Sequence, residues 1–220
     1  MKVGTDAVLL GAWAGVAGAS KILDVGTGCG LLALMMAQRT GLKTSITAID
    51  IDPVAAARAK ENFRSSPWSP RLSSHCIALD DYVNQTQKHF DLMVSNPPWF
   101  KDALRSQSEE RNLARHACSM TLPALFQAGE RLLCHGGNLC IIIPFQDFRK
   151  ACDFGLLKGF SLSRALVVKP SPSKEPFRAL MEFQSGKTSA VSEDTIFIRD
   201  APGSYSKAYR ELTKDFYLDF

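Results

Sequence analysis

The chain has 220 residues, of which 45% are hydrophobic and 22% charged, with a formal net charge of +4. That length can bury one sizeable core but is too short for a second full domain, so we expect a single α/β domain over residues 1–220. No apolar run approaches the roughly 20 residues that span a bilayer, and the first residues lack the pattern of a secretory signal. The composition argues against a membrane protein and predicts a cytoplasmic one, whose mild positive charge permits binding to a polyanion.

The cysteines and histidines show no metal-binding pattern. The six cysteines have no C-x-x-C spacing, and several lie inside apolar segments, where a thiol behaves as a small hydrophobe. The four histidines do not cluster with the cysteines or with acids at the spacing of metal ligands. We therefore expect reduced cysteines in the core and no metal site.

Short apolar runs alternate with helix-length segments along the first two thirds of the chain, which predicts a parallel sheet with helices on both faces. The expected strands cover residues 21–25, 45–50, 75–79, 90–95 and 138–144. The expected helices cover residues 7–13, 31–39, 53–63 and 122–134. Asp6 is a candidate N-cap for the first helix, and Asp52 followed by proline is a good start for the third.

The last third of the chain has a different character. Residues 161–169 and 176–184 predict two longer strands, and the Pro-Ser-Pro-Ser run at 170–173 between them suits a hairpin. We expect this antiparallel pair to close the edge of the sheet. Residues 206–216 predict a terminal helix.

The strongest local signal is a strand that runs into a glycine-rich turn and then into a helix. Residues 24–30 read D-V-G-T-G-C-G. Glycine suits such a turn because a side chain would block the close approach of a ligand to the backbone. A dinucleotide-binding G-x-G-x-x-G turn would need glycine at position 31, which is Leu31. The pattern instead resembles motif I of the class I methyltransferases.

The resemblance implies a cofactor, S-adenosylmethionine, and a role for each residue of the turn. Asp24 would lie near the methionine end of the cofactor, and Gly26, Gly28 and Gly30 would line its backbone. The implied fold is Rossmann-like, with a seven-stranded, mostly parallel sheet, one antiparallel edge strand and helices on both faces.

Two further acids follow the next two strands. Asp50, at the end of the second strand, stands where an acid accepts hydrogen bonds from both ribose hydroxyls. Asp80 follows the third strand, where the family often contacts the adenine amino group, and Asp81 is the alternative if the register differs. A single such acid is more often a helix cap or a solvated carboxylate. Three acids at the ends of consecutive strands favour cofactor binding.

The fourth strand leads into Asn96, Pro97, Pro98 and Trp99. This run resembles the [DNS]-P-P-[FYW] motif of methyltransferases that act on planar amino or amide nitrogens. Hydrogen bonds from an exocyclic NH2 to the Asn96 side chain and the Pro97 carbonyl would favour its pyramidal, reactive geometry, and the prolines would hold these acceptors in place. Trp99 offers a surface for stacking the target ring, worth about 1 to 3 kcal/mol. The alternative is a rigid turn with no chemistry.

Segments outside these motifs resemble the bacterial tRNA1(Val) adenine-N6 methyltransferase family, whose target is adenosine 37 beside the anticodon. The similar segments span nearly the whole chain: residues 1–13, 30–39, 66–68, 111–116, 205–209 and 216–218. In this resemblance Thr5 and Asp6 lie near the amino-acid end of the cofactor. Relatives usually carry a short further stretch ahead of the segment that begins here at Met1, and tyrosine in place of Trp99.

The implied partner is a tRNA, with no membrane and no obligatory protein partner. Phosphates need cations, and the candidates after the reaction motif and on the C-terminal hairpin are Lys101, Arg105, Arg111, Arg115, Lys174 and Arg178. Each could equally be a solvated surface charge. The alternatives are an rRNA guanine-N2 or protein glutamine-N5 methyltransferase on the same fold, or a non-catalytic binding module.

Overall fold

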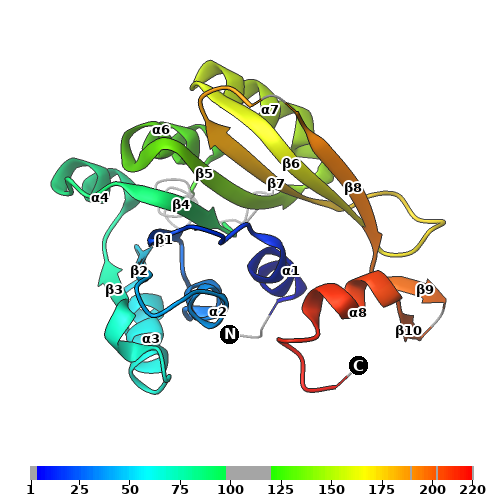
Figure 1. Ribbon diagram of the computed structural model, residues 1–220, viewed down its shortest axis with the longest axis horizontal. Coiled ribbons are helices and arrows are strands. Elements are labelled where there is room, and N and C mark those ends of the chain that lie inside the picture. Colours follow the sequence, from blue (N-terminus) through cyan, green and yellow to red (C-terminus); the bar gives the residue numbers. More distant parts are fainter. Residues whose placement is uncertain (1–3, 98–119, 189, 202, 220) are drawn as a thin grey trace, which may run out of the picture.

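A computed structural model describes residues 4–97, 120–188, 190–201 and 203–219 of the chain. Its centre is an eight-stranded sheet in the order β3-β2-β1-β4-β5-β7-β6-β8 (Figure 1). The strands are β1 (Lys21–Val25), β2 (Ser45–Asp50), β3 (Leu72–Cys76), β4 (Phe90–Ser95), β5 (Leu133–Pro144), β6 (Phe160–Lys169), β7 (Arg178–Ser185) and β8 (Ser192–Phe197). β7 runs antiparallel to both of its neighbours, and every other pairing is parallel.

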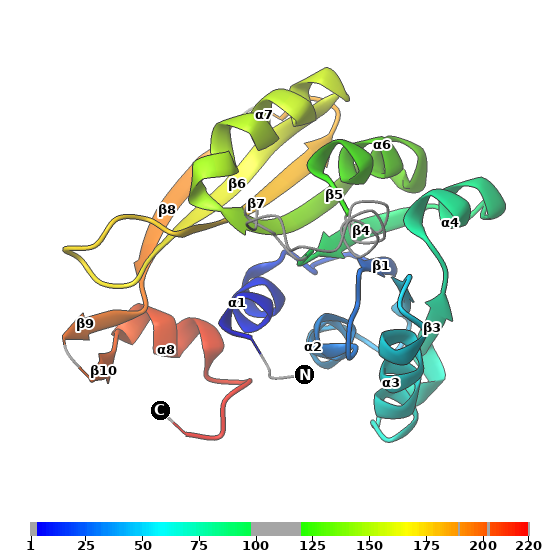
Figure 2. The ribbon, with the colours of Figure 1, turned by 180° about the vertical axis from the view of Figure 1, so that it is seen from behind.

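Helices cover both faces of the sheet (Figures 1 and 2). One face carries α1 (Thr5–Trp13), α2 (Leu31–Arg39), α3 (Pro53–Arg64) and α8 (Lys207–Thr213). The other carries α4 (Leu79–Gln85), α6 (Leu122–Leu132) and α7 (Phe148–Leu157). A short hairpin, β9 (Arg199–Ala201) and β10 (Ser204–Tyr205), lies before α8. Each face buries its own apolar cluster, so the sheet is apolar on both sides, as the sequence predicts.

The structure confirms the predicted fold class and most predicted elements, and differs at the edges of the sheet. The sheet has eight strands instead of seven, and the antiparallel strand β7 lies between β5 and β6 instead of at an edge. The third strand covers Leu72–Cys76, three residues earlier than predicted. Neither edge strand is a buried apolar run: β3 has no buried residue and β8 is exposed over its first four residues. Both are largely polar, which weakens the apolar signal on which the prediction depends.

Two details of the sequence analysis need correction. Asp6 does not cap α1: the N-cap is Gly4, and Asp6 lies in the first turn. The five described cysteines are free, but only Cys140 is buried, and Cys76 is exposed. By contrast, Asp52 caps α3 as predicted, since its Oδ1 accepts from the Val54 N–H at 2.9 Å. None of the described helices is long and apolar enough to cross a membrane.

The start of α2 depends on glycine at position 30. Gly30 has φ +85°, and a Cβ there would lie 2.5 Å from Cε1 of Phe63. We expect Gly30→Ala to lower the free energy of unfolding by about 2–4 kcal/mol, since the left-handed backbone costs roughly 1–2 kcal/mol and overpacking adds a similar amount. Gly136 has φ +78° but open space around it. Gly136→Ala is therefore the control for the backbone cost alone. If urea unfolding showed equal losses of unfolding free energy in both variants, the contact with Phe63 would be refuted.

Candidate functional site

The predicted site residues converge on the carboxyl edge of the sheet. β1 pairs in parallel with β2 and with β4, and Val25 stands beside both Ile49 and Ser95. The turns that follow these three strands therefore leave the sheet side by side. They bring the glycine turn, Asp50 and Asn96 to one edge, as expected for a parallel sheet.

The glycine turn between β1 and α2 needs its glycines. Gly26, Gly28 and Gly30 have φ of 72°, 59° and 85°, a region that side chains disfavour. The N–H groups of Gly26 and Thr27 donate to the carbonyl of Ile49 at 2.9 and 3.0 Å, which ties the turn to the end of β2. The turn is thus held rigidly against the strand that supplies Asp50.

Asp24 lies beneath this turn and is completely buried. Its Oδ2 accepts hydrogen bonds from the Thr27 hydroxyl at 2.6 Å and from the Ala33 N–H at 3.2 Å. Its Oδ1 has no hydrogen-bond partner among the described residues. Burial raises the pKa of Asp24 to about 7, although both hydrogen bonds oppose the shift. The carboxyl group therefore shapes the turn and also keeps one acceptor atom for a ligand.

Asp50, at the end of β2, reaches across to the turn. Its Oδ2 accepts from the Gly28 N–H at 2.8 Å, and its Oδ1 accepts from the Asp52 N–H at 2.9 Å. The side chain is held by these two bonds, and each carboxylate oxygen keeps further capacity to accept. Such a fixed and partly exposed carboxylate suits a pair of hydroxyl donors.

Asp80 and Asp81 both lie in the first turn of α4 and are exposed. Because β3 ends at Cys76, neither acid follows its strand directly. The loop between is nevertheless fixed to the edge, since the Ile77 N–H donates to the Asp50 carbonyl at 2.9 Å. Both acids therefore follow a loop that is anchored to the end of β2.

The described part of the reaction motif follows β4 directly. Asn96 is partly buried and Pro97 is buried. Pro98 and Trp99 lie outside the described residues, and so do Lys101, Arg105, Arg111 and Arg115.

Two residues at this edge were not anticipated from the sequence. The buried Ser95 donates to the Val25 carbonyl at 2.8 Å and joins the end of β4 to the glycine turn. The signal that could have predicted the role of Ser95 is a polar residue at the end of an apolar strand. Ile51, beside Asp50, is 45% exposed although it is apolar, which suits a flat apolar ligand surface. No sequence signal separates it from a core isoleucine.

Asp6, which the sequence predicts at the cofactor, and Arg178, which it predicts at RNA phosphate, form an ion pair with each other. Thr5 is exposed at the start of α1, while Asp6 forms an ion pair with Arg178, Nε to Oδ2 at 2.7 Å. Lys174 is exposed in the connection between β6 and β7. Among the described residues, no group of three or more potential metal ligands gathers.

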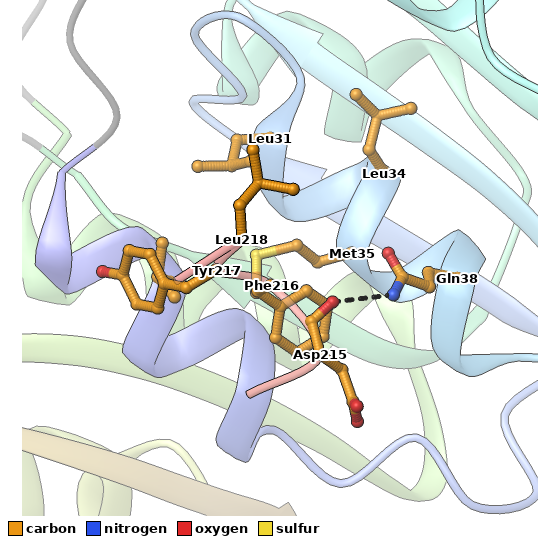
Figure 3. Close-up of a pocket in the computed structure, with 9 residues that line it drawn as sticks. Leu31, Leu34, Met35, Gln38, Asp215, Phe216, Tyr217 and Leu218 are labelled. Carbon is orange, nitrogen blue, oxygen red and sulfur yellow. Dashed lines mark hydrogen bonds between the residues drawn. The ribbon is translucent and has the colours of Figure 1, made fainter. Parts of the chain in front are cut away.

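A separate cavity of about 300 Å³ lies between α1, α2 and the C-terminal tail (Figure 3). Gln38 donates to the Asp215 carbonyl at 3.0 Å, and Leu31 of α2 and Leu218 of the tail both line the cavity. The lining is mostly apolar and includes none of the predicted site residues. The cavity is thus a packing feature beside the site, and Val8 and Leu31 on its wall show that α1 and α2 begin close together.

Comparison with known proteins places this architecture. The family model described as the methyltransferase small domain matches residues 6–152. A predicted O-methyltransferase from Agrobacterium tumefaciens is 16% identical, with a TM-score of 0.71 over 96% of each chain. TrmN from Thermus thermophilus is 19% identical, with a TM-score of 0.55 over 76% of this chain and 44% of that one. At such identities the structural likeness shows the fold alone.

The family model and the fold together define a methyltransferase of the class that uses S-adenosylmethionine. The chain is 37% identical over 218 residues to the tRNA1(Val) (adenine(37)-N6)-methyltransferase of Shigella dysenteriae, and 39% identical over 218 residues to the protein of that name from Parabacteroides distasonis. These matches cover 99% of this chain and 89% and 91% of the two relatives. The chain belongs to the family of these proteins.

The residues present fit this cofactor. The glycine turn holds left-handed backbone conformations that glycine adopts readily, Asp50 keeps acceptor capacity for ribose hydroxyls, and the buried Oδ1 of Asp24 lacks a described partner. A cationic amino group near Asp24 would favour the ionised carboxylate and lower its pKa below the value of about 7.

This predicts a pH dependence of cofactor affinity. Binding that requires ionised Asp24 strengthens as pH rises through 7, so we expect affinity for S-adenosylhomocysteine to increase about tenfold between pH 6 and pH 8. Isothermal titration calorimetry at both values measures it. Asp24→Asn should bind weakly and with little pH dependence. An unchanged slope in this variant would mean that another group titrates.

Proposed function

We propose that this protein transfers the methyl group of S-adenosylmethionine to N6 of adenosine 37 in the anticodon loop of a tRNA, with tRNA1(Val) as the candidate. The observation that carries the proposal is the position of Asn96-Pro97 at the end of β4, directly beside the glycine turn. The names of relatives that match along almost the entire chain support adenine as the target. A tRNA substrate also favours a cytoplasmic location.

In this proposal Asn96 and Pro97 orient the target nitrogen. The adenine amino group donates one hydrogen bond to the Asn96 side-chain oxygen and one to the Pro97 carbonyl, so its lone pair is directed away from both. The bound cofactor supplies an electrophilic methyl group on a sulfonium. The methyl group would pass to this nitrogen with loss of the neutral thioether, and the displaced proton would pass to solvent. Catalysis depends mainly on position, which the rigid Asn-Pro-Pro turn secures.

The cofactor is held by groups that the fold fixes beforehand. Asp50 would accept from the ribose hydroxyls, and the backbone of the glycine turn would hold the methionine portion. Asp24 sits beneath that portion, and Thr5 and Asp6 border its amino-acid end. Asp80 or Asp81 is the proposed partner of the adenine amino group.

The proposed RNA contacts involve residues that lie outside the described part of the chain. Trp99 would stack on the target base after it leaves the anticodon loop, where unpairing costs little. Lys101, Arg105, Arg111 and Arg115 would bind the flanking phosphates.

The test offers the protein three substrates with labelled S-adenosylmethionine: tRNA, ribosomes and peptide release factors. The proposal expects label in tRNA, as N6-methyladenosine in nucleoside mass spectrometry. Label in ribosomal guanosine or in protein glutamine would replace it with the guanine-N2 or glutamine-N5 alternative. Cofactor binding without transfer to any of the three would indicate a non-catalytic module.

A further inference from the structure

The ion pair between Asp6 and Arg178 joins two parts of the chain that are 172 positions apart. Asp6 is the only charged side chain of α1, and Arg178 begins β7 beside Pro144, the last residue of β5. Both side chains are about three-quarters buried, with exposed fractions of 25% and 28%. The pair therefore fixes the amino end of α1 to the carboxyl edge of the sheet, on the β5–β7 side of the reaction motif.

Arg178 is committed to this arrangement by its other contacts. Its Nη1 donates to the Phe177 carbonyl at 3.1 Å, and its guanidinium lies 5.3 Å from the centre of the Phe177 ring. Two of its three nitrogens are thus engaged within the protein. Bidentate recognition of a phosphate uses two guanidinium nitrogens, and here two of the three already donate to protein oxygens.

The opposite end of α1 is fixed as well. Arg39 donates to the carbonyls of Gly11 and Ala14 at 2.7 and 2.8 Å, and Arg164 donates to the Trp13 carbonyl at 3.0 Å. These cations lie at the negative end of the helix dipole, and Asp6 lies at its positive end. An ion pair therefore holds the amino end of α1, and arginine hydrogen bonds to backbone carbonyls hold its carboxyl end.

The position of α1 is transmitted to the glycine turn through α2. The two helices pack closely at Gly11, where any Cβ would overlap the side chain of Met35. α2 begins directly after Gly30, and Leu31 in its first turn shares a cavity wall with Val8 of α1. A shift of the amino end of α1 would therefore disturb the start of α2 and the turn that precedes it.

We propose that Arg178 is a positioning residue: its ion pair with Asp6 holds α1 against the cofactor side of the site, instead of binding RNA phosphate as the sequence predicts. This rests on the proposed function only for the identity of the cofactor. Loss of the pair should weaken cofactor binding and leave the electrostatic attraction to RNA nearly unchanged.

The experiment is a double-mutant cycle with Arg178→Ala, Asp6→Ala and the double variant, read out as the dissociation constant of S-adenosylhomocysteine by calorimetry. A partly buried ion pair is worth about 1 kcal/mol, so Arg178→Ala should weaken binding about fivefold. Asp6→Ala should weaken it at least as much, and adding Arg178→Ala to it should have little further effect. Arg178→Lys, which keeps the charge, should lose less than Arg178→Ala.

Lys158→Ala is the matched control, since it breaks the Lys158–Glu130 ion pair at 3.2 Å between α6 and the end of α7. It should leave cofactor affinity unchanged. The proposal is overturned if Arg178→Ala leaves cofactor affinity intact but weakens tRNA binding. Loss of a phosphate contact would also reduce the slope of log affinity against log salt concentration by about one. The proposal is also overturned if Arg178→Ala keeps its full effect in the Asp6→Ala background. Because this readout contains no tRNA, failure of the proposed substrate would leave the cycle interpretable.

Discussion

Asn96→Ala should reduce kcat/KM for tRNA methylation by about a hundredfold to a thousandfold, the usual cost of removing one preorganised polar group from a transition state. Asn96 directly follows β4, and the adjoining Ser95 is bonded to the Val25 carbonyl at the start of the glycine turn. An alanine keeps the backbone but removes the side-chain acceptor for the target amino group. Steady-state methylation of tRNA measures the loss, with KM and kcat determined separately.

Two comparisons make this prediction specific. Asn96→Asp retains an acceptor and should keep far more activity than Asn96→Ala. Affinity for S-adenosylhomocysteine should be nearly the same in both variants and in the parent protein, because the side chain is assigned to the substrate. If Asn96→Ala retained full activity, the Asn-Pro-Pro run would be only a structural turn.

Asp50→Ala should weaken cofactor binding by at least about a hundredfold. Hydrogen bonds to a charged group are worth about 1.5–3 kcal/mol each, and two ribose hydroxyls would lose their acceptor. The same substitution removes the acceptor of the Gly28 N–H, so the glycine turn also loses a support. Calorimetric titration with S-adenosylhomocysteine measures the affinity directly.

Asp52→Ala provides the matched control for Asp50→Ala. Asp52 is two residues away and caps α3 through the Val54 N–H. Its removal should cost about 1 kcal/mol of stability without changing cofactor affinity. Equal losses of affinity in both variants would show that the region is merely destabilised, and Asp50 would then lose its assigned role.

Residues on the two sides of the reaction motif occupy different halves of the same sheet edge. The acids expected at the cofactor follow β1, β2 and β3, whereas Arg178 and Phe177 lie beyond β5, on the other side of the reaction motif. The ion pair of Asp6 with Arg178 bridges the two halves, which is why its substitutions distinguish cofactor positioning from RNA binding.

The sequence by itself determined the central strands and the chemistry of the edge. β1, β2 and β4 have the predicted bounds because buried parallel strands are continuous apolar runs with clear ends. Parallel pairing then brings their carboxyl ends together, so strand ends and the resemblance of the two motifs together assigned Asp24, Asp50 and Asn96 to one edge.

Only the tertiary structure decided what depends on contacts between distant residues. The structure places β3 three residues earlier than predicted and contains β8, which was not predicted. Both are polar edge strands, which lack the apolar pattern that predicts a strand. The structure buries Asp24 beneath the turn, which raises its pKa. It also showed that Arg178 pairs with Asp6, because no local sequence pattern predicts an ion pair between residues 172 positions apart.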